Sequence, residues 1–179
     1  MELGMIGLGR MGGNMAQRLL RGGHRVVAYD PDPEAVQAQS GEGATGVNSI
    51  REMVARLALP RSVWVMVPSG EPTESTIVEL TETLSPGDTV IDGGNSNYGD
   101  SMRRAESVRE QGLLWLDAGT SGGVWGLKEG YSLMVGGDRE AFDRLEPVIQ
   151  TLAPSPERGY GYVGPAGAGH FVKMVHNGI

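Results

Sequence analysis

The sequence contains no cysteine, only three histidines, and no apolar run near the length of a membrane-spanning helix. The lack of cysteine excludes disulfides, thiolate catalysis and cysteine-bound metals, and three scattered histidines give no pattern for a zinc site. The net charge of −7 includes no basic run, which argues against nucleic-acid and anionic-membrane partners. We therefore expect a cytoplasmic protein without a metal, a membrane span or a targeting leader.

What the sequence does contain is a regular alternation of short apolar runs and segments with helical spacing. The predicted strands cover residues 3–6, 25–29, 44–47, 62–67, 89–92, 113–118, 132–135 and 160–163. The predicted helices cover residues 11–20, 34–39, 50–57, 77–84, 98–111, 139–152 and 166–179. Such alternation predicts an α/β fold with a doubly wound, mainly parallel sheet of the Rossmann type. Since no linker interrupts the pattern, we expect one domain over residues 1–179.

The first predicted strand leads into a glycine-rich turn at the start of the first predicted helix. In a Gly-x-Gly-x-x-Gly turn, Gly7 allows a tight bend, Gly9 lets a pyrophosphate approach the backbone, and Gly12 lets the helix pack closely on the strand. The unpaired amides of the helix N-terminus favour an anion. A purely structural turn is the alternative, but the order strand, turn, helix, strand favours a dinucleotide. The expected cofactor contacts here are Gly7, Leu8, Gly9, Arg10, Met11 and Gly12.

The second predicted strand ends in an acidic residue, Asp30, about 20 residues after the glycines. An acidic residue at this place accepts hydrogen bonds from the adenosine ribose and repels a 2′-phosphate, so NAD is favoured over NADP. The alternative is that Asp30 and Asp32 only cap the next helix, an interpretation that we prefer for Asp32. At the end of a later strand, Val67, Pro68 and Ser69 should also contact the cofactor.

The loops that follow the predicted strands should converge on one cleft, because ligands bind such sheets beyond the carboxyl ends of the strands. These loops are residues 7–12, 30–32, 68–71, 93–96 and 120–123. The last of them includes Ser121, Gly122 and Gly123, whose hydroxyl and bare amides suit a substrate carboxylate or hydroxyl. Composition alone supports an ordinary surface loop equally well.

A second candidate for chemistry lies in the last predicted helix. Lys173 and Asn177 are four residues apart and share a helical face, with His176 beside them. A lysine next to an amide in an apolar helix is unusual for a solvated charge. A lysine whose stem lies along the surface while its ammonium reaches water is the open alternative.

Together these motifs resemble those of 6-phosphogluconate dehydrogenase, the decarboxylating enzyme. The matching motifs are Gly-Leu-Gly-Arg-Met-Gly at 7–12, Ile-Asp-Gly-Gly-Asn-Ser at 91–96, Ser-Gly-Gly at 121–123 and Gly-Ala-Gly-His-Phe-Val-Lys-Met-Val-His-Asn-Gly at 167–178. They occur in the family's order along nearly the whole chain. The related 3-hydroxyisobutyrate dehydrogenases share the first, the third and the Lys-x-x-x-Asn pair, but do not normally carry Asp-Gly-Gly-Asn.

The resemblance implies a role for each matching residue. Asn95 would contact the cofactor on the nicotinamide side, the Ser-Gly-Gly stretch would bind substrate, and His176 and Asn177 would hydrogen-bond it. Lys173 and Asn177 are the implied catalytic pair. Lys173 would be the general base towards the C3 hydroxyl and then polarise the 3-keto group so that carbon dioxide leaves. The implied substrate is a small sugar-acid phosphate, 6-phosphogluconate, which becomes ribulose 5-phosphate.

The chain also departs from the family's pattern. Asp-Pro-Asp at 30–32 and Pro-Ser-Gly at 68–70 replace Asn-Arg-Thr and Lys-Ala-Gly, and both changes resemble the NAD-preferring branch. So does Val-Trp-Gly-Leu at 124–127, in which Trp125 either lines the cleft or packs. In the family a C-terminal helical domain follows, with the dimer interface and the phosphate-binding residues. The glutamate that acts as the acid in the family's enol-to-ketone step would lie just past Ile179. The resemblance thus implies a truncated dinucleotide-binding domain, inactive alone, from a full-length protein that is a homo-oligomer.

Two other functions stay open from the sequence. One is a dehydrogenase for a different 3-hydroxy acid, because the residues that would hold a phosphate are not in this chain. The other is a non-catalytic NAD-binding module. The presence of both Lys173 and Asn177 argues against the module, since binding a dinucleotide requires neither residue.

Overall fold

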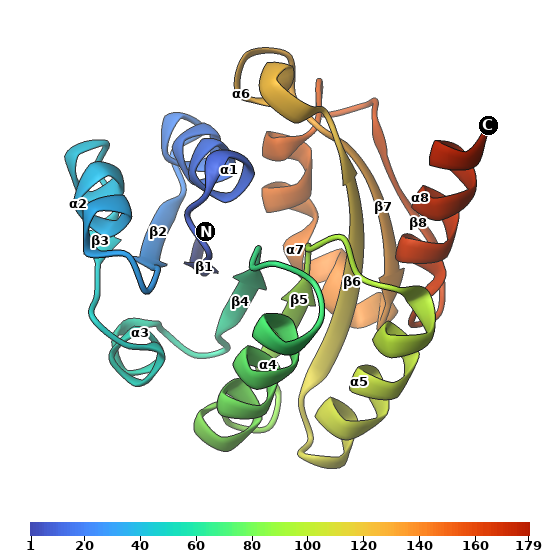
Figure 1. Cartoon of the computed structure of the whole chain (residues 1–179), viewed down its shortest axis with the longest axis horizontal. Coiled ribbons are helices and arrows are strands. Elements are labelled where there is room, and N and C mark those ends of the chain that lie inside the picture. The colour runs from blue at the N-terminus through green and yellow to red at the C-terminus, as the bar shows by residue number, and fades with distance from the viewer.

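One sheet runs through the whole molecule. The computed structural model describes residues 1–179, and its eight strands follow the order β3-β2-β1-β4-β5-β6-β7-β8 (Figure 1). The strands are β1 (Glu2–Ile6), β2 (Arg25–Tyr29), β3 (Thr45–Gly46), β4 (Ser62–Val65), β5 (Thr89–Asp92), β6 (Leu114–Ser121), β7 (Ser132–Gly137) and β8 (Tyr160–Gly164). The helices are α1 (Arg10–Arg21), α2 (Pro33–Gly41), α3 (Ile50–Arg56), α4 (Glu71–Thr83), α5 (Tyr98–Glu110), the 3₁₀ helix η1 (Gly123–Trp125), α6 (Gly126–Glu129), α7 (Arg139–Leu152) and α8 (Ala168–Gly178). None of these helices combines the length and apolarity needed to cross a lipid bilayer.

The strand directions confirm the predicted doubly wound, mainly parallel sheet. All pairs from β3 to β6 are parallel, and the chain reverses its direction of travel across the sheet between β1 and β4. β7 pairs antiparallel with β6, and β8 runs parallel to β7. A parallel crossover needs a dozen or more residues, and residues 122–131 between β6 and β7 are too few. The chain therefore returns along β6 in the opposite direction.

The structure corrects several predicted boundaries. β4 ends at Val65, because Val65 pairs with Asp92, the last residue of β5 before a pair of glycines. β6 continues to Ser121, since its antiparallel pairing with β7 extends to Ser132. The short helices η1 and α6 were not expected from a glycine-rich stretch that carries no helical spacing.

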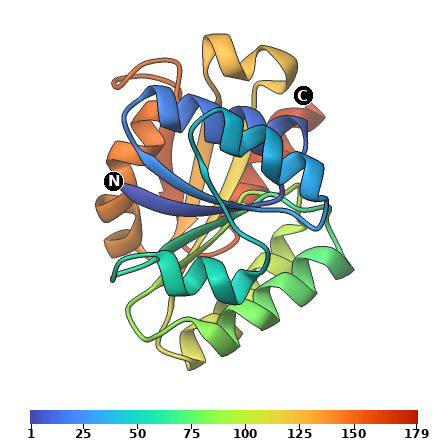
Figure 2. The ribbon, with the colours of Figure 1, turned by 90° about the vertical axis from the view of Figure 1, so that its left-hand side faces the viewer.

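Helices cover both faces of the sheet and form two apolar cores. On one face α1 and α7 pack through residues such as Met15 and Leu145. On the other face α3, α4 and α5 pack through residues such as Met53 and Leu80. Figure 2 shows this layering, with α1 in blue above the sheet and α3 and α4 in teal and green below it. Trp64 on β4 and Trp115 on β6 are fully buried.

The C-terminal helix α8 rests directly on the backbone of β6 and β7. A side chain at Gly119 would come within 2.7 Å of the Gly169 carbonyl, and one at Gly136 within 2.7 Å of the Gly169 amide. A side chain at Gly169 itself would come within 2.3 Å of the Asp117 carbonyl. These glycines allow the close approach, which lies at the opposite end of the molecule from α2 (Figure 1).

Candidate active site

A cleft of about 680 Å³ opens beyond the carboxyl ends of the central strands. It lies where the strand order reverses between β1 and β4, the place at which open α/β sheets bind ligands. All the loops predicted to converge contribute to its wall. The lining residues are Gly7, Gly9, Arg10, Met11, Gly12, Asp30, Pro31, Met66, Val67, Pro68, Pro72, Ser75, Thr76, Gly93, Gly94, Asn95, Thr120 and Lys173.

The glycine turn has the geometry expected for approach of a pyrophosphate. Gly7 has a φ of +91°, and a Cβ there would lie 2.5 Å from the Met66 carbonyl. A Cβ at Gly12 would lie 2.0 Å from the Gly7 carbonyl, so α1 packs directly on the turn. A Cβ at Gly9 would meet nothing within 4 Å, so the backbone there faces open space. Helix α1 has no side-chain cap and no acidic residue in its first turn, which leaves its amides available to an anion.

Asp30 supports the same turn from the end of β2. Its Oδ2 accepts a hydrogen bond of 2.7 Å from the Leu8 amide, and its Oδ1 accepts one of 2.8 Å from the Asp32 amide. The side chain of Leu8 is buried and its amide is bonded to Asp30, so Leu8, a predicted cofactor contact, does not line the cleft. Asp32 caps α2 by accepting from the Glu34 amide, as predicted. Asp30 therefore places a carboxylate at the cleft wall and fixes the glycine turn.

A second hollow, of about 340 Å³, adjoins the cleft and shares Asn95 and Lys173 with it. Its other lining residues are Ser96, Asn97, Tyr98, His170, Met174 and Asn177. Asn95 reaches both cavities because the backbone before it is pressed against β4: a Cβ at Gly93 would lie 2.1 Å from the indole nitrogen of Trp64. Two connected cavities with one shared amide and one shared amine suit a cofactor and a small substrate that must meet.

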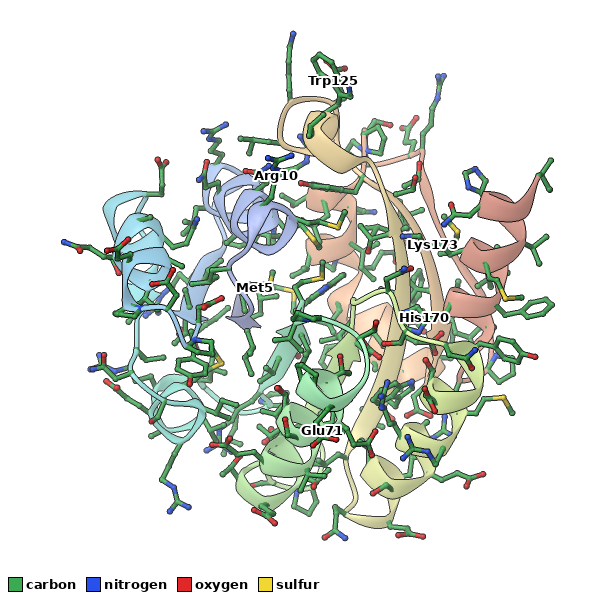
Figure 3. All side chains as sticks on the ribbon, viewed as in Figure 1. Met5, Arg10, Glu71, Trp125, His170 and Lys173 are labelled. Atoms are coloured by element: carbon green, nitrogen blue, oxygen red, sulfur yellow. The ribbon has the colours of Figure 1, made fainter.

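Lys173 lies on the inner side of α8, between the helix and β6 (Figure 3). Its Nζ donates a hydrogen bond to the Thr120 carbonyl. Burial lowers the pKa of the Lys173 ammonium below its ordinary value of 10.5. A lowered pKa makes the neutral amine more accessible, which is what a general base needs.

Buried Asp117 fixes the helix that carries Lys173. Its Oδ1 accepts 2.7 Å from the Gly167 amide and its Oδ2 accepts 3.1 Å from the His170 amide, so it caps α8 from within β6. His170 is also buried, with Nδ1 2.6 Å from the Ser101 hydroxyl. Sequence reasoning missed Asp117 and His170. An aspartate in the otherwise apolar strand Leu-Trp-Leu-Asp-Ala was the available signal.

Several predicted site residues lie away from both cavities. Ser121, Gly122 and Gly123 follow the end of β6, and neither cavity is lined by them. Ser69 is likewise outside the lining. Trp125 is 69% exposed and points outward at the top of Figure 3, so it neither packs nor lines the cleft.

His176 belongs to a different surface. It lines a shallow hollow with residues of β7 and β8, among them Met134 and Tyr160. Asn177, in contrast, lines the same hollow as Lys173. The structure therefore brings Lys173, Asn177 and Asn95 together and places His176 on another side of α8.

The pH dependence of stability should reveal the partial burial of Lys173. Because burial lowers its pKa in the folded state, the unfolded state binds more protons between that lowered value and 10.5. Within this window the contribution of Lys173 to the free energy of unfolding of the wild type should rise with pH. Lys173→Met lacks this contribution, so any stability advantage of the variant at neutral pH should shrink as the pH approaches 10.5. Urea denaturation of the wild type and the variant across this range measures the change.

Lys128→Met is a suitable control, because Lys128 is exposed and only approaches its neighbour Glu129. The difference between this variant and the wild type should stay constant over the same pH range. A constant difference for Lys173→Met as well would show that the Lys173 ammonium is fully hydrated in the folded chain.

Comparison with known proteins agrees with this geometry. A family model described as the NAD binding domain of 6-phosphogluconate dehydrogenase matches residues 2–164. The NAD(+)-dependent, decarboxylating 6-phosphogluconate dehydrogenase of Haloferax volcanii is 46% identical over the whole chain, which spans 58% of that protein. A putative 6-phosphogluconate dehydrogenase of Bacillus subtilis is 44% identical over the whole chain, which spans 59% of it.

Solved structures show the same fold in two kinds of enzyme. The 6-phosphogluconate dehydrogenase of Plasmodium falciparum, solved with NADP+ and with its substrate, has a TM-score of 0.90 and 30% identity over 99% of this chain and 40% of that one. The 3-hydroxyisobutyrate dehydrogenase of Mycobacterium tuberculosis has a TM-score of 0.89 and 30% identity over 98% of this chain and 58% of that one. The chain thus spans less than two thirds of these relatives. Since the family model matches nearly all of it, the chain belongs to the family of NAD-binding domains of 6-phosphogluconate dehydrogenase.

Proposed function

We propose that the chain is the cofactor-binding domain of an NAD-linked dehydrogenase that oxidises 6-phosphogluconate at C3 and decarboxylates it to ribulose 5-phosphate. The observation that carries the proposal is that one cleft is lined both by the bare glycine turn and by Lys173. The turn suits a diphosphate, and the amine suits proton transfer at a neighbouring substrate. The curated relatives that carry this activity in their names match the chain over its whole length.

The residues divide the work of binding and proton transfer. The first-turn amides of α1 and the glycine turn hold the diphosphate, while Asn95 orients the nicotinamide end from the wall shared by both cavities. When bound, NAD supplies the acceptor for the hydride from C3. Neutral Lys173 takes the proton of the C3 hydroxyl, and its ammonium then donates a hydrogen bond to the 3-keto oxygen. As the carboxylate leaves as carbon dioxide, the electron pair of the C1–C2 bond forms the C2–C3 double bond and the 3-oxygen becomes an enol. Ribulose 5-phosphate forms when this enol takes up a proton at C2. Asn177 hydrogen-bonds the substrate in the second hollow.

The cleft accommodates such a cofactor without rearrangement of the turn. The space in front of Gly9 is open, whereas Gly7 and Gly12 are in close contact with other backbone atoms. A diphosphate can occupy this space because residue 9 has no side chain to obstruct it. Asp30 adds a carboxylate beside Pro31 at the edge of the cleft, where it favours NAD over NADP. The NADP+ in the Plasmodium enzyme makes this preference a question for experiment.

A second candidate is a dehydrogenase for a different 3-hydroxy acid, which the likeness to a 3-hydroxyisobutyrate dehydrogenase favours. The sequence Asp-Gly-Gly-Asn at 92–95 supports the first candidate, because 3-hydroxyisobutyrate dehydrogenases do not normally carry this motif. A protein with the full length of the relatives should be assayed with 6-phosphogluconate and with 3-hydroxyisobutyrate. Turnover of the second acid alone would select the second candidate. From the family resemblance we also infer that a protein with the full length of the relatives is a homo-oligomer.

Titration of the chain with NAD and NADP tests the proposed function. Trp64 lies beneath Gly93 and donates a hydrogen bond to the sulfur of Met66, which lines the cleft, so its fluorescence should report binding. We expect tighter binding of NAD. The double variant Asp30→Ser with Pro31→Arg should shift the ratio of the two dissociation constants towards NADP by about tenfold, because a repulsive carboxylate is replaced by a phosphate-binding guanidinium.

Two control variants separate the effect of the Asp30 charge from its role in holding the glycine turn. Asp30→Asn keeps an oxygen that can accept from the Leu8 amide but removes the charge. Asp32→Asn keeps the cap of α2 and should leave the ratio unchanged. An unchanged ratio in the double variant would remove Asp30 from cofactor selection, and failure of the wild type to bind either nucleotide would overturn the proposed function.

A further inference from the structure

A buried guanidinium connects α4, α5 and the loop that carries Asn95. Arg104 on α5 is 3% exposed, and its Nε donates 2.8 Å to Glu74 on α4. One of its terminal nitrogens lies 3.6 Å from Oδ2 of Asp92, the last residue of β5. Arg103, the preceding residue, also binds Glu74 through two hydrogen bonds of 2.8 and 2.9 Å. The two arginines and the two carboxylates balance in charge, which offsets part of the cost of burying Arg104 and Asp92.

The carboxylate of Asp92 holds both neighbours of Asn95. Its Oδ1 accepts 3.1 Å from the Gly94 amide, and its Oδ2 accepts 2.7 Å from the Ser96 hydroxyl. Asn95 lies between these two contacts, at the wall shared by the cofactor cleft and the second hollow. The orientation of Asn95 therefore depends on where the Asp92 carboxylate is held. Arg104 is the cation that faces this carboxylate.

Glu74 connects the same arrangement to the part of the cleft wall that α4 forms. It lies in α4, whose first turns line the cleft through Pro72, Ser75 and Thr76. The guanidiniums of Arg103 and Arg104 lower the pKa of the Glu74 carboxyl to about 2, so Glu74 is ionised at all physiological pH values. The α4 wall and the Asn95 loop thus meet at one guanidinium, through a hydrogen bond to Glu74 and through an ion pair with Asp92 at a distance longer than a hydrogen bond.

We propose that Arg104 is a positioning residue that sets the distance between the α4 wall and Asn95, and thereby the affinity for the nicotinamide half of NAD. The proposal rests on the proposed function, because it assigns Asn95 to the nicotinamide end. Arg104 touches neither cofactor nor substrate. It acts through Asp92, which holds the loop, and through Glu74, which holds the helix.

The test compares NAD with ADP-ribose, which lacks the nicotinamide. Isothermal titration of the wild type, Arg104→Lys and Asn95→Ala with both ligands measures each contribution. A lysine has one ammonium and cannot span Glu74 and Asp92 as a guanidinium does. We expect Arg104→Lys to weaken NAD binding about tenfold and to leave ADP-ribose binding unchanged. The double variant with Asn95→Ala should be no weaker than Asn95→Ala alone, because the two residues act in series.

Arg103→Lys is the matched control, because Arg103 shares Glu74 but does not approach Asp92. It should bind NAD as the wild type does. Ser96→Ala is a second variant, which can be measured even if Arg104→Lys fails to fold, because Ser96 is partly exposed. It removes the hydrogen bond from the Ser96 hydroxyl to Asp92. We expect a smaller loss of affinity for NAD and no loss of affinity for ADP-ribose.

The outcomes are distinct. Equal losses for NAD and ADP-ribose, no loss, or additive effects with Asn95→Ala would overturn the role of Arg104. A wild type that binds ADP-ribose and NAD equally would overturn the role of Asn95 on which it depends. A wild type that binds neither ligand would overturn the proposed function itself.

Discussion

Gly12→Ala is expected to destabilise the chain by about 3 kcal/mol, a large fraction of the stability of a domain this size. The added methyl group would lie 2.0 Å from the Gly7 carbonyl and 3.1 Å from the Met66 side chain. Because the first of these is backbone, α1 can relieve the overlap only by moving away from β1. The loss should outweigh the gain in helix propensity of about 1 kcal/mol that alanine brings to a helix interior. Urea denaturation measures the difference.

Gly9→Ala is the matched comparison, because the same methyl group there meets nothing within 4 Å. Its stability should differ from that of the wild type by less than about 0.5 kcal/mol. Its affinity for NAD should fall, since the methyl group points into the space where the diphosphate approaches. Equal stability of Gly12→Ala and Gly9→Ala would show that the close packing of α1 on the turn does not occur in solution.

Lys173→Met in a protein with the full length of the relatives is expected to lower kcat by at least about 10³-fold with NAD affinity unchanged. In the proposed mechanism Lys173 serves as base for the C3 hydroxyl and then as hydrogen-bond donor to the ketone, and a single general acid or base contributes about 10²- to 10⁴-fold. Methionine has a similar length but no proton to exchange. The affinity for NAD should survive because the diphosphate is held by α1 and the glycine turn.

Lys128→Met in the same protein should turn over normally, because Lys128 is exposed and lies outside both cavities. Retained turnover in Lys173→Met would place the base elsewhere. A rise in KM with unchanged kcat would assign Lys173 to substrate binding alone.

The glycine turn and most strands could be predicted from the sequence because their causes are local. Gly7 and Gly12 act within one turn of chain, and strands such as 25–29 and 89–92 carry their apolar pattern within a few residues. The alternation of strands and helices then restricts the topology, and with it the edge of the sheet where loops meet. This is why the cleft was predicted together with the fold.

The placement of residues around α8 could not be read from spacing alone. A helix turns about 100° per residue, so His176 lies about 60° from Lys173 on one side, and Asn177 about 40° on the other. Which side faces the cavity depends on how α8 is seated on β6 and β7. That seating is fixed by Gly119, Gly136 and the cap from Asp117, which are distant in sequence. The spacing therefore predicted one group of Lys173, His176 and Asn177, whereas in the structure only Lys173 and Asn177 line the same hollow.

Because α8 rests on glycines of β6 and β7, main-chain contacts help to set the position of the Lys173 amine. A helix that packs on side chains can shift when one of them changes size. Beneath Gly169, α8 instead contacts the carbonyl groups of Asp117 and Met134. The main-chain contacts at these glycines thus help to keep the amine at the Thr120 carbonyl. A substitution that adds a side chain at Gly119, Gly136 or Gly169, or that removes the Asp117 carboxylate, should therefore displace α8 and the Lys173 amine together.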